Sequence, residues 1–436
     1  MTCSFDAGSG RTPAGPGLVP NAVLEATMRL LFTTSNWAGH YFCMIPLGWA
    51  AQAAGHEVRV VCAPAQADTI GRAGLVPVPV LESPDMMYMA RLNLYAQVAE
   101  GRAALPGLPL HPVTGQRVSR LDEFDVAAAQ KAFTGEYGDA VRISHLRTRE
   151  FARAWRPQLV CHDVLAEEGA LVADELGVES VYCAPGLFGT VDEELGLDLA
   201  LRDLVNNMAR PGVPAWGRDR ITRVIDPSPP SAVPPLGDAV RMPVRYVPYN
   251  GPGALPAWTL ERRTRPRVCV VWGRSATGIY GPDVPALREA VEGAAALGAD
   301  VVLTAAPEQV RALGPLPQGV RVLEDFPLHL LLPEADVLVH HGSDNCLMNG
   351  AVAGVPQLSL AMASDQIAFS RRLAATGAVV ALEGLTARPD ALRAALAVLL
   401  DDPAPRAAAG RLQAEMALAP APSEVLRQLT ESVAAV

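Results

Sequence analysis

The most constraining feature of this 436-residue sequence is a regular alternation of short apolar strands with helices, which runs through the chain twice. The first run begins with an apolar strand at 29–34, a helix from about 43 to 55 and a second strand at 57–62. A strand, a helix and a strand in such close succession are typical of a βαβ unit, whose strands pair in parallel. The sequence therefore predicts an α/β protein built on parallel sheets.

A proline-rich stretch at 226–266 separates the two runs, and its composition is typical of a connection between domains. The alternation resumes with a strand at 267–272 and a helix at 283–297. Other strands are expected at 158–163, 180–183, 301–304, 320–323, 337–339 and 357–360, and another helix at 167–176. The predicted division is a disordered N-terminal extension (1–27), a first βα domain (28–225), an interdomain linker (226–266), a second βα domain (267–420) and a C-terminal helix or tail (421–436).

Composition and charge exclude several classes of protein. The chain is 50% hydrophobic and 19% charged, which excludes intrinsic disorder. The net charge of −10 argues against nucleic acid or an anionic membrane as a partner. The 7 cysteines are scattered without metal-binding spacing, so we expect reduced thiols in a cytoplasmic protein and no metal site. We expect no secretory signal in 1–27 and no transmembrane segment, because the longest uncharged window, 345–364, is interrupted by glycine, proline and glutamine.

Polar residues at the carboxyl ends of the strands carry most of the functional information, because ligands of parallel α/β sheets bind there. In the second half, a predicted strand leads through His341 and Gly342 into a helix that starts near Ser343 and Asn345. A helix N-terminus attracts anions, small residues let a diphosphate approach the backbone, and His341 can donate a hydrogen bond to it. The alternative is that Ser343, Asp344 and Asn345 only cap the helix.

Asp365 and Gln366 form a second polar pair, at the start of a helix expected at 367–376. Side by side, they offer both acceptors and donors of hydrogen bonds, which suits the vicinal hydroxyls of a sugar. The alternative is again that this pair caps the helix that follows.

The order of these motifs resembles the donor-binding signature of inverting family 1 glycosyltransferases. The resemblance is closer to the actinobacterial enzymes that attach deoxysugars to polyketide and similar antibiotic aglycones. The matching segments in the second half are 340–342, 353–357, 365–366 and 371–372. Segments 47–60 and 245–252 resemble the same group, so that the resemblance spans about 28–420.

The resemblance implies the GT-B fold, in which two Rossmann-like, doubly wound parallel-sheet domains face each other. It implies that the C-terminal domain binds a nucleoside-diphosphate sugar, here expected to be a dTDP-deoxysugar, and that the N-terminal domain binds a hydrophobic natural-product aglycone. It implies no cofactor and no metal, because the nucleotide sugar is a co-substrate, and it leaves a homodimer open. The expected activity is an inverting, metal-independent transfer of the sugar to the aglycone.

The donor motif departs from the family pattern at positions that bear on donor binding. Cys346 stands where a hydroxyl usually helps to hold phosphate, and Asp344 puts a carboxylate near the diphosphate. At ~4–6 Å and an effective dielectric of about 20, this repulsion amounts to roughly a few kcal/mol. We therefore expect Asp344 either to point away as a helix cap or to weaken donor binding. By their places in the family motifs, Arg274 and Ser275 are expected to contact the diphosphate, and Phe326 to stack on the base.

In the first half, His40 follows the first strand and matches the position of the family's catalytic histidine. Transfer to a hydroxyl needs a base, and the pKa of an imidazole lies near neutrality. Asp163, at the end of another strand, matches the carboxylate that orients this histidine, while Glu167 and Glu168 are alternatives one helical turn away. The side chain of His162 is expected on the other face of its strand. A structural role for His40 is the competing interpretation.

The segment 85–150 is expected to be helical and irregular, and it contributes most of the residues assigned to the acceptor. These residues are large and mostly apolar: Trp37, which precedes His40, and Met86, Met87, Met89 and Tyr95. Burial in a core is an equally good interpretation of the methionines and Tyr95, and the sequence leaves both open.

Three other classes of protein were compared with these motifs. A dinucleotide-dependent dehydrogenase would carry Gly-x-Gly-x-x-Gly after the first strand, where this chain has 35–40 without that pattern. A metal-dependent GT-A transferase would carry Asp-x-Asp, which this sequence lacks. A non-catalytic relative, acting as an auxiliary partner or a nucleotide-sugar-binding protein, stays open. The altered phosphate loop supports it, whereas His40 and Asp163 oppose it.

Overall fold

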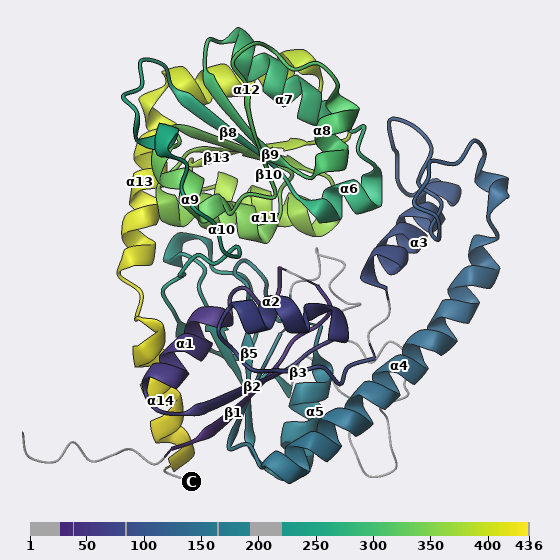
Figure 1. Ribbon diagram of the computed structural model, residues 1–436, viewed down its shortest axis with the longest axis vertical. Coiled ribbons are helices and arrows are strands. Elements are labelled where there is room, and N and C mark those ends of the chain that lie inside the picture. Colours follow the sequence, from purple (N-terminus) through teal and green to yellow (C-terminus); the bar gives the residue numbers. More distant parts are fainter. Residues whose placement is uncertain (1–26, 38, 83–84, 164, 192–219, 435–436) are drawn as a thin grey trace, which may run out of the picture.

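The computed structural model describes residues 27–434 except 38, 83–84, 164 and 192–219, and within these ranges it shows a pair of parallel sheets, one above the other (Figure 1). The N-terminal domain contains β1 (Arg29–Thr33), α1 (Ile45–Ala53), β2 (Glu57–Val61), α2 (Ala67–Arg72), β3 (Pro77–Val78), α3 (Met86–Ala99), α4 (Val126–Trp155), β4 (Leu159–His162), α5 (Glu167–Leu176), β5 (Glu179–Cys183), β6 (Arg223–Asp226) and β7 (Val240–Pro243). The C-terminal half of the chain contains β8 (Arg267–Trp272), α6 (Arg274–Tyr280), α7 (Pro285–Ala296), β9 (Asp300–Ala305), α8 (Pro307–Leu313), β10 (Arg321–Glu324), α9 (Leu328–Leu331), β11 (Val337–His340), α10 (Asp344–Ala353), β12 (Gln357–Ala361), α11 (Ser364–Ala374), β13 (Val379–Glu383), α12 (Pro389–Asp401), α13 (Pro403–Ala417) and α14 (Pro422–Ala434).

The N-terminal sheet has the strand order β3-β2-β1-β4-β5-β6-β7, with all neighbours parallel. The strand β1 lies inside this sheet, where Leu30 pairs with Val58 of β2 and with Leu159 of β4. Leu30, Leu31 and Phe32 are fully buried, which explains the uninterrupted apolar run, since parallel sheets are covered on both faces. The predicted class, α/β with parallel sheets in two domains, is therefore confirmed.

The C-terminal sheet has the order β10-β9-β8-β11-β12-β13 and is parallel throughout. In both sheets the strand order reverses beside the first strand, between β1 and β4 and between β8 and β11. Doubly wound sheets bind ligands in the crevice at such a reversal. The loops that follow these four strands therefore define the region in which a site is expected.

The predicted linker 226–266 was too wide. The strand β7 lies within that range, and it pairs with β6 as the last strand of the N-terminal sheet. The prolines that suggested a linker belong partly to the β6–β7 loop, where the Arg241 guanidinium donates to the Asp226 carboxylate (2.7 Å). The connection between the two sheets therefore starts only after Pro243.

The C-terminal helix α14 returns to the N-terminal domain, as the yellow ribbon in Figure 1 shows. Its Leu426 and Leu429 are buried in the same apolar cluster as Ile45 and Leu47 of α1. The predicted extension 1–27 lies outside the described ranges except for Thr27, whereas the predicted C-terminal helix 421–436 is described up to residue 434. None of the helices within the described ranges is long and apolar enough to cross a membrane.

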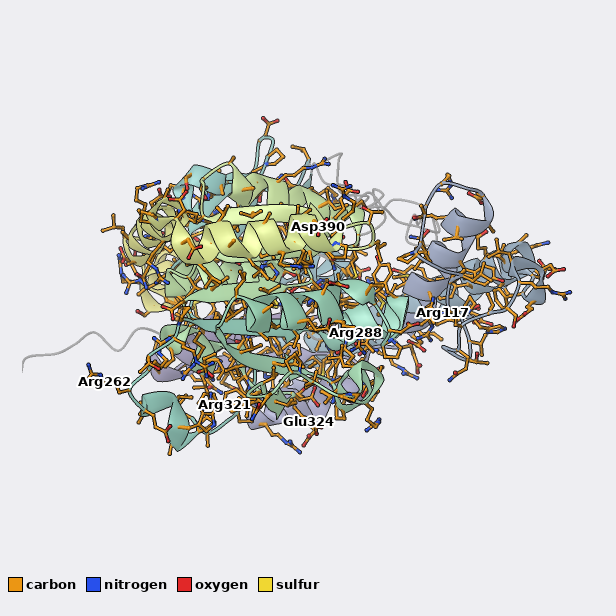
Figure 2. All side chains as sticks on the ribbon, turned by 90° about the horizontal axis from the view of Figure 1, so that it is seen from above. Arg117, Arg262, Arg288, Arg321, Glu324 and Asp390 are labelled. Carbon is orange, nitrogen blue, oxygen red and sulfur yellow. The ribbon has the colours of Figure 1, made fainter. Side chains whose placement is uncertain are left out.

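Within the described ranges, the two sheets' domains contact each other near α10 and α11 and also at the side of the molecule. Near α10 and α11, a shared apolar cluster joins Leu171 and Tyr182 of the N-terminal domain to Met348 and Phe369 of the C-terminal domain. At the side of the molecule, α3 and α4 form a projecting arm, and α3 packs against α6 (Figure 1). Arg117 lies where this arm meets the C-terminal domain (Figure 2), and its guanidinium donates to the Tyr280 carbonyl (3.2 Å).

Candidate active site

The carboxyl ends of β1 and β4 bring His40 and Asp163 together. His40 lies in the loop after β1, where its amide donates to the Trp37 carbonyl (3.0 Å) in a tight turn. Asp163 directly follows β4, which is paired with β1. The His40 Nδ1 atom and the Asp163 Oδ2 atom are 3.7 Å apart, so the two side chains face each other without a direct hydrogen bond.

The Ser35 hydroxyl fills the space between these two side chains. It lies 3.1 Å from His40 Nδ1 and 2.8 Å from Asp163 Oδ2. The Ser35 amide (2.7 Å) and the Thr34 hydroxyl (3.1 Å) donate to the same Oδ2 atom, and the Leu165 amide (2.8 Å) donates to Oδ1. These donors hold the buried Asp163 side chain in one orientation.

The surroundings of His40 keep its imidazole neutral. His40 is only 7% exposed, and burial lowers its pKa, while the nearby Asp163 carboxylate raises it and offsets part of this effect. A neutral imidazole can accept a proton at pH 7, as a general base requires. The rings of Trp37 and Phe188 flank it, each with its centroid 6.2 Å from that of the imidazole.

The other candidate partners of His40 have different surroundings. The His162 ring stacks on Tyr182, with the centroids 5.8 Å apart, and its Nδ1 donates to the Asp163 carbonyl (3.0 Å). Glu168 is buried in α5, and burial raises its pKa to about 7, to which repulsion from Asp163 contributes. The side chain of Glu167 lies outside the described residues. The geometry thus favours Asp163 over these alternatives.

In the C-terminal domain, the loop after β11 is held by His340, to which the sequence assigned no role. Its Nε2 lies 3.0 Å from Gln357 Oε1, and its Nδ1 accepts from the Gly342 amide (3.0 Å). Burial lowers the pKa of His340 to about 3, so the ring is neutral and keeps this bonding pattern. Gly342 has a φ of 88°, and a Cβ there would lie 2.8 Å from Ala361, so only glycine fits this turn.

His341 lies between the first turns of α10 and α6. Its Nδ1 accepts from the Gly273 amide (3.3 Å), which leaves Nε2 to carry the proton. Burial lowers the pKa of His341 to about 4, so the ring is a neutral hydrogen-bond donor at pH 7. Ser275 is half-buried in the first turn of α6, two residues after Gly273. This arrangement is compatible with the predicted contacts of His341 and Ser275 to a diphosphate.

Of the two outcomes expected for Asp344, the structure excludes the helix cap, because Ser343 holds that position. The Ser343 hydroxyl accepts from the Cys346 amide (3.3 Å). Ser343 is therefore a helix cap, which was the alternative to a role in phosphate binding. Asp344 instead has a buried Oδ2 atom with no hydrogen-bond partner among the described residues. Burial, with a smaller contribution from Asp365, raises its pKa to about 7, so Asp344 is partly protonated near neutral pH. Cys346 is a buried neutral thiol, since burial raises its pKa to about 12.

Asn345, in the first turn of α10, connects this helix to the loop that carries His40. Its Nδ2 atom donates to the Gly39 carbonyl (3.2 Å), and its Oδ1 accepts from the Tyr246 hydroxyl (3.4 Å). Asn349, one turn later, donates to the same Tyr246 hydroxyl (3.0 Å). Asn345, which was predicted to bind the nucleotide sugar, thus makes a hydrogen bond across the domain interface directly beside His40.

Gln366 caps its own helix, which was the alternative to binding a sugar hydroxyl. Its Oε1 atom accepts from the amides of Met362 (3.1 Å) and Ala363 (3.3 Å), so it closes the first turn of α11. Asp365 is half-buried next to it, and burial raises the pKa of its carboxyl. Of this pair, Asp365 therefore remains the better candidate for a sugar hydroxyl.

Arg274 is the first residue of α6, and Phe326 lies just before α9. The Arg274 guanidinium pairs with the Asp325 carboxylate (Nε to Oδ1 3.0 Å), so its charge is already balanced within the protein. Phe326, the next residue after Asp325, is partly buried, and its amide donates to the Thr304 hydroxyl (3.1 Å). The stacking of Phe326 on a base stays a prediction.

Four of the residues assigned to the acceptor, Met86, Met87, Met89 and Tyr95, lie on α3 in the arm. Tyr95 is fully buried, and its hydroxyl donates to the Leu121 carbonyl (2.8 Å). Met87 packs on α6, where a Cβ on Gly278 would lie 2.7 Å from its sulfur. Met86 is also buried and Met89 is half-buried in α3. The sequence could not separate these cases, because a methionine-rich helix has the same pattern on a core and beside a cleft.

Nothing in the described ranges groups three or more histidine, cysteine or acidic side chains as a metal site would. The residues that sequence reasoning missed are Ser35, His340 and the interdomain role of Asn345. A hydroxyl directly after a central strand was the available signal for Ser35, whereas the contacts of Asn345 depend on how the two domains pack.

Comparison with known proteins places this geometry in a class. Among solved structures, the spinosyn forosaminyltransferase SpnP has a TM-score of 0.72 and 28% identity, over 93% of this chain and 99% of that one. The spinosyn rhamnosyltransferase SpnG, complexed with thymidine diphosphate, has a TM-score of 0.69 and 29% identity, over 92% and 100%. The fold and site therefore define a GT-B glycosyltransferase, as the resemblance in the sequence indicated.

The family follows from the sequence comparisons. Models of the erythromycin biosynthesis protein CIII-like family match with their N-terminal domain at residues 49–273 and with their C-terminal domain at 288–432. The 10-deoxymethynolide desosaminyltransferase of Streptomyces venezuelae is 31% identical over 92% of this chain and 96% of its own length. The TDP-daunosamine transferase DnrS of Streptomyces peucetius is 33% identical over 92% and 97%. The chain belongs to this family of antibiotic deoxysugar glycosyltransferases.

Proposed function

We propose that the protein is an inverting, metal-independent glycosyltransferase. It transfers the sugar of a dTDP-deoxysugar to a hydroxyl of a hydrophobic natural-product aglycone. The observation that carries this proposal is the unit of His40, Ser35 and Asp163, which lies at the domain interface. Asn345, in the first turn of α10, bonds to the carbonyl of the residue before His40. A base and a candidate diphosphate site are therefore adjacent, as transfer from a nucleotide sugar requires.

The comparisons support the choice of donor and acceptor class. SpnG and VinC were solved with thymidine diphosphate and dTDP, and DnrS is named for a TDP-sugar. SpnG was also solved with spinosyn aglycone. Because this chain is similar to these proteins over nearly its whole length, we extend a thymidine-type donor and a hydrophobic aglycone to it.

In the proposed step, the aglycone hydroxyl attacks C1 of the sugar while His40 Nε2 takes the hydroxyl proton. The new bond joins the aglycone oxygen to C1, and the bond between C1 and the diphosphate oxygen breaks, with its electron pair leaving on the diphosphate. The N-terminus of α10 and the neutral donor His341 stabilise this developing charge. This proposed reaction does not require a metal ion.

A single displacement with inversion fits the state of Asp163. A double displacement needs a carboxylate that is free to attack C1. Asp163 is buried, and both of its oxygens already accept hydrogen bonds from Ser35, Thr34 and Leu165. This carboxylate can orient and stabilise His40, but it is badly placed to act as a nucleophile.

The test is an assay of the full-length chain with dTDP-α-linked deoxysugars and a panel of hydrophobic polycyclic and macrolactone alcohols. We expect a product heavier by one sugar, with the β configuration at C1 by NMR, and no change on adding EDTA. Retention of the α configuration would refute inversion, and loss of turnover in EDTA with recovery in Mg²⁺ would refute metal independence.

The alternative, a non-catalytic auxiliary or nucleotide-sugar-binding protein, draws support from the donor site. Arg274 is paired with Asp325, and Asp344 adds an acid to the phosphate loop. The two functions separate in the same assay, because the non-catalytic protein would bind dTDP and neither hydrolyse nor transfer the sugar. We also propose a cytoplasmic location, which agrees with the unpaired cysteines in the described ranges.

A further inference from the structure

The buried hydroxyl of Ser35 is the only side-chain atom that the described structure places within hydrogen-bond distance of both His40 Nδ1 and Asp163. We infer that Ser35 is a positioning residue that transmits the effect of Asp163 to His40. This inference rests on the proposed function of His40 as the base, and it adds a third member to that pair.

The direction of each hydrogen bond follows from the number of protons available. A carboxylate only accepts, so the 2.8 Å contact is donated by the Ser35 hydroxyl to Asp163 Oδ2. A hydroxyl has one proton, so the 3.1 Å contact with the ring must be donated by His40 Nδ1. Ser35 therefore fixes the tautomer in which Nδ1 carries the proton and Nε2 has its lone pair free.

The backbone explains why the serine can do this. Ser35 lies two residues beyond the end of β1, and its amide donates to Asp163 Oδ2 (2.7 Å). The same residue therefore clamps the carboxylate with its main chain and contacts it with its side chain. At 3.7 Å, the separation of Nδ1 and Oδ2 is too long for a direct hydrogen bond, so the hydroxyl is the link.

The proton balance of the step is unchanged by this link. The aglycone proton goes to Nε2, and the Nδ1 proton stays on the ring, bonded to Ser35. The imidazolium that forms is stabilised by the hydrogen bond to Ser35, whose own proton points to the Asp163 anion. Without the hydroxyl, the imidazolium is less stable and the neutral ring can turn or adopt the other tautomer.

The pH dependence must be separated from that of neighbouring groups. The titratable groups around the pair are Cys43 before α1, His162 of β4, Glu168 of α5, Tyr182 and Cys183 of β5 and, beyond Cys43, Asp344 of α10. Burial raises the pKa of Cys43 and Tyr182 well above their usual values, so both stay neutral. Glu168 and Asp344 each have a pKa raised to about 7 and titrate in the relevant range.

The first test reads the tautomer directly, without substrate. The full-length chain is labelled with ¹⁵N-histidine, and the His40 signals are assigned by their loss in His40→Ala. We expect the Nδ1–H pattern in the wild type and a shift toward Nε2–H in Ser35→Ala. The matched control is Thr34→Val, which removes another donor to Asp163 but keeps the bridge, and should keep the Nδ1–H pattern. An Nε2–H pattern in the wild type, or no change in Ser35→Ala, would overturn the inference.

The second test is kinetic. Ser35→Ala should lower kcat by about 10- to 100-fold with little change in KM for the donor, because the base is misoriented while the donor site is intact. The acidic limb of kcat/KM should move to lower pH, since the imidazolium has lost a stabilising hydrogen bond. Ser35→Thr, which keeps the hydroxyl, should restore the limb and most of kcat. The comparison is repeated in Glu168→Gln and Asp344→Asn backgrounds, where the same shift should persist.

The outcomes distinguish this inference from the function on which it rests. A Ser35→Ala enzyme that unfolds earlier but keeps the wild-type limb and tautomer has lost a merely structural serine, and the inference fails. If His40→Ala transfers the sugar at the full rate, the proposed base is wrong, while the tautomer measurement still decides whether Ser35 sets the state of His40.

Discussion

The two domains supply the two halves of the site in different states of completion. In the N-terminal half, the Asp163 oxygens accept from Ser35, Thr34 and Leu165, and the serine in turn contacts His40. The Asp163 oxygens, the Ser35 hydroxyl and His40 Nδ1 each have a protein partner, and the unit is buried. It is preorganised for proton transfer before any substrate binds.

In the C-terminal half, the polar groups are either engaged elsewhere or left without a partner. Arg274 pairs with Asp325, and Asn345 bonds to Gly39 across the interface. Asp344 has a buried oxygen with no partner in the described ranges of the chain. The difference suggests that the acid–base unit is built by the fold alone, whereas the donor site takes its final arrangement from the donor. Mutations in the first half should therefore affect turnover, and those in the second half should affect binding.

The largest effect that separates the two halves is expected for His40→Ala. Loss of a general base should lower kcat by roughly 10²–10⁴-fold, whereas dTDP affinity should stay the same. Turnover is measured by product mass and affinity by calorimetric titration. His329→Ala serves as a control, because this histidine lies in α9 and bonds to Asn250 away from the unit. A parallel loss of dTDP affinity in His40→Ala would mean that the two halves are not separate.

Asp163→Asn tests the same half with a smaller expected effect. The amide keeps the shape but loses the charge, and it turns one acceptor into a donor that faces Ser35. We expect kcat to fall by about 10²-fold, less than in His40→Ala. Asp163 raises the pKa of His40, so its loss should move the acidic limb of kcat/KM to lower pH. An acidic limb that stays in place would show that Asp163 does not act on the base.

The sequence predicted the first half better than the second for a physical reason. His40 and Asp163 follow adjacent central strands of a parallel sheet, and strand ends of such a sheet meet at one edge. Their meeting is therefore dictated by local pattern and topology. Ser35 was missed because its role depends on a distance of a few ångströms within the loop, which no strand pattern encodes.

The donor half depends on packing between distant segments. Gln366 closes its own helix, and Asn345 reaches a carbonyl that lies 306 residues earlier in the chain. The range 226–266 was misjudged for a related reason, since prolines in the β6–β7 loop resemble those of a linker. The methionine cluster was ambiguous, and the structure places Met87 against α6.

His341→Ala tests the donor-binding half of the site. Loss of a hydrogen bond to a charged phosphate should weaken dTDP binding by about 1.5–3 kcal/mol. Because burial lowers the pKa of His341 to about 4, the ring is neutral above pH 5.5, and the loss of affinity should be the same from pH 6 to 8. Titration calorimetry at several pH values measures it. Thermal unfolding of the variant must be followed as well, since the ring also accepts from Gly273. Unchanged affinity would remove His341 from the donor site.

Asp344→Asn, whose effect on the site is expected to be the smallest, tests the Asp344 Oδ2 atom, which has no hydrogen-bond partner among the described residues. The folded pKa of about 7 lies above the usual 3.8, so the folded state binds the proton more tightly than the unfolded chain. The stabilisation by this proton is complete below about pH 4 and is lost as the pH rises through about 7. The free energy of unfolding of the wild type should therefore fall relative to that of Asp344→Asn between pH 5 and 8, by about 2–3 kcal/mol.

Denaturant titrations at pH 5 and pH 8 measure this difference, and the control is Asp390→Asn, whose side chain is 92% exposed on α12 (Figure 2). Asp390→Asn should leave the difference between the two pH values unchanged. The same variants decide where Asp344 points. If its carboxyl faces the phosphates, Asp344→Asn binds dTDP more tightly than the wild type at pH 8 and similarly at pH 5, because only the ionised acid repels the diphosphate. If dTDP affinity is unchanged at both pH values while the stability difference persists, Asp344 acts only within the protein, and the donor half tolerates its acid because the acid points away from the ligand.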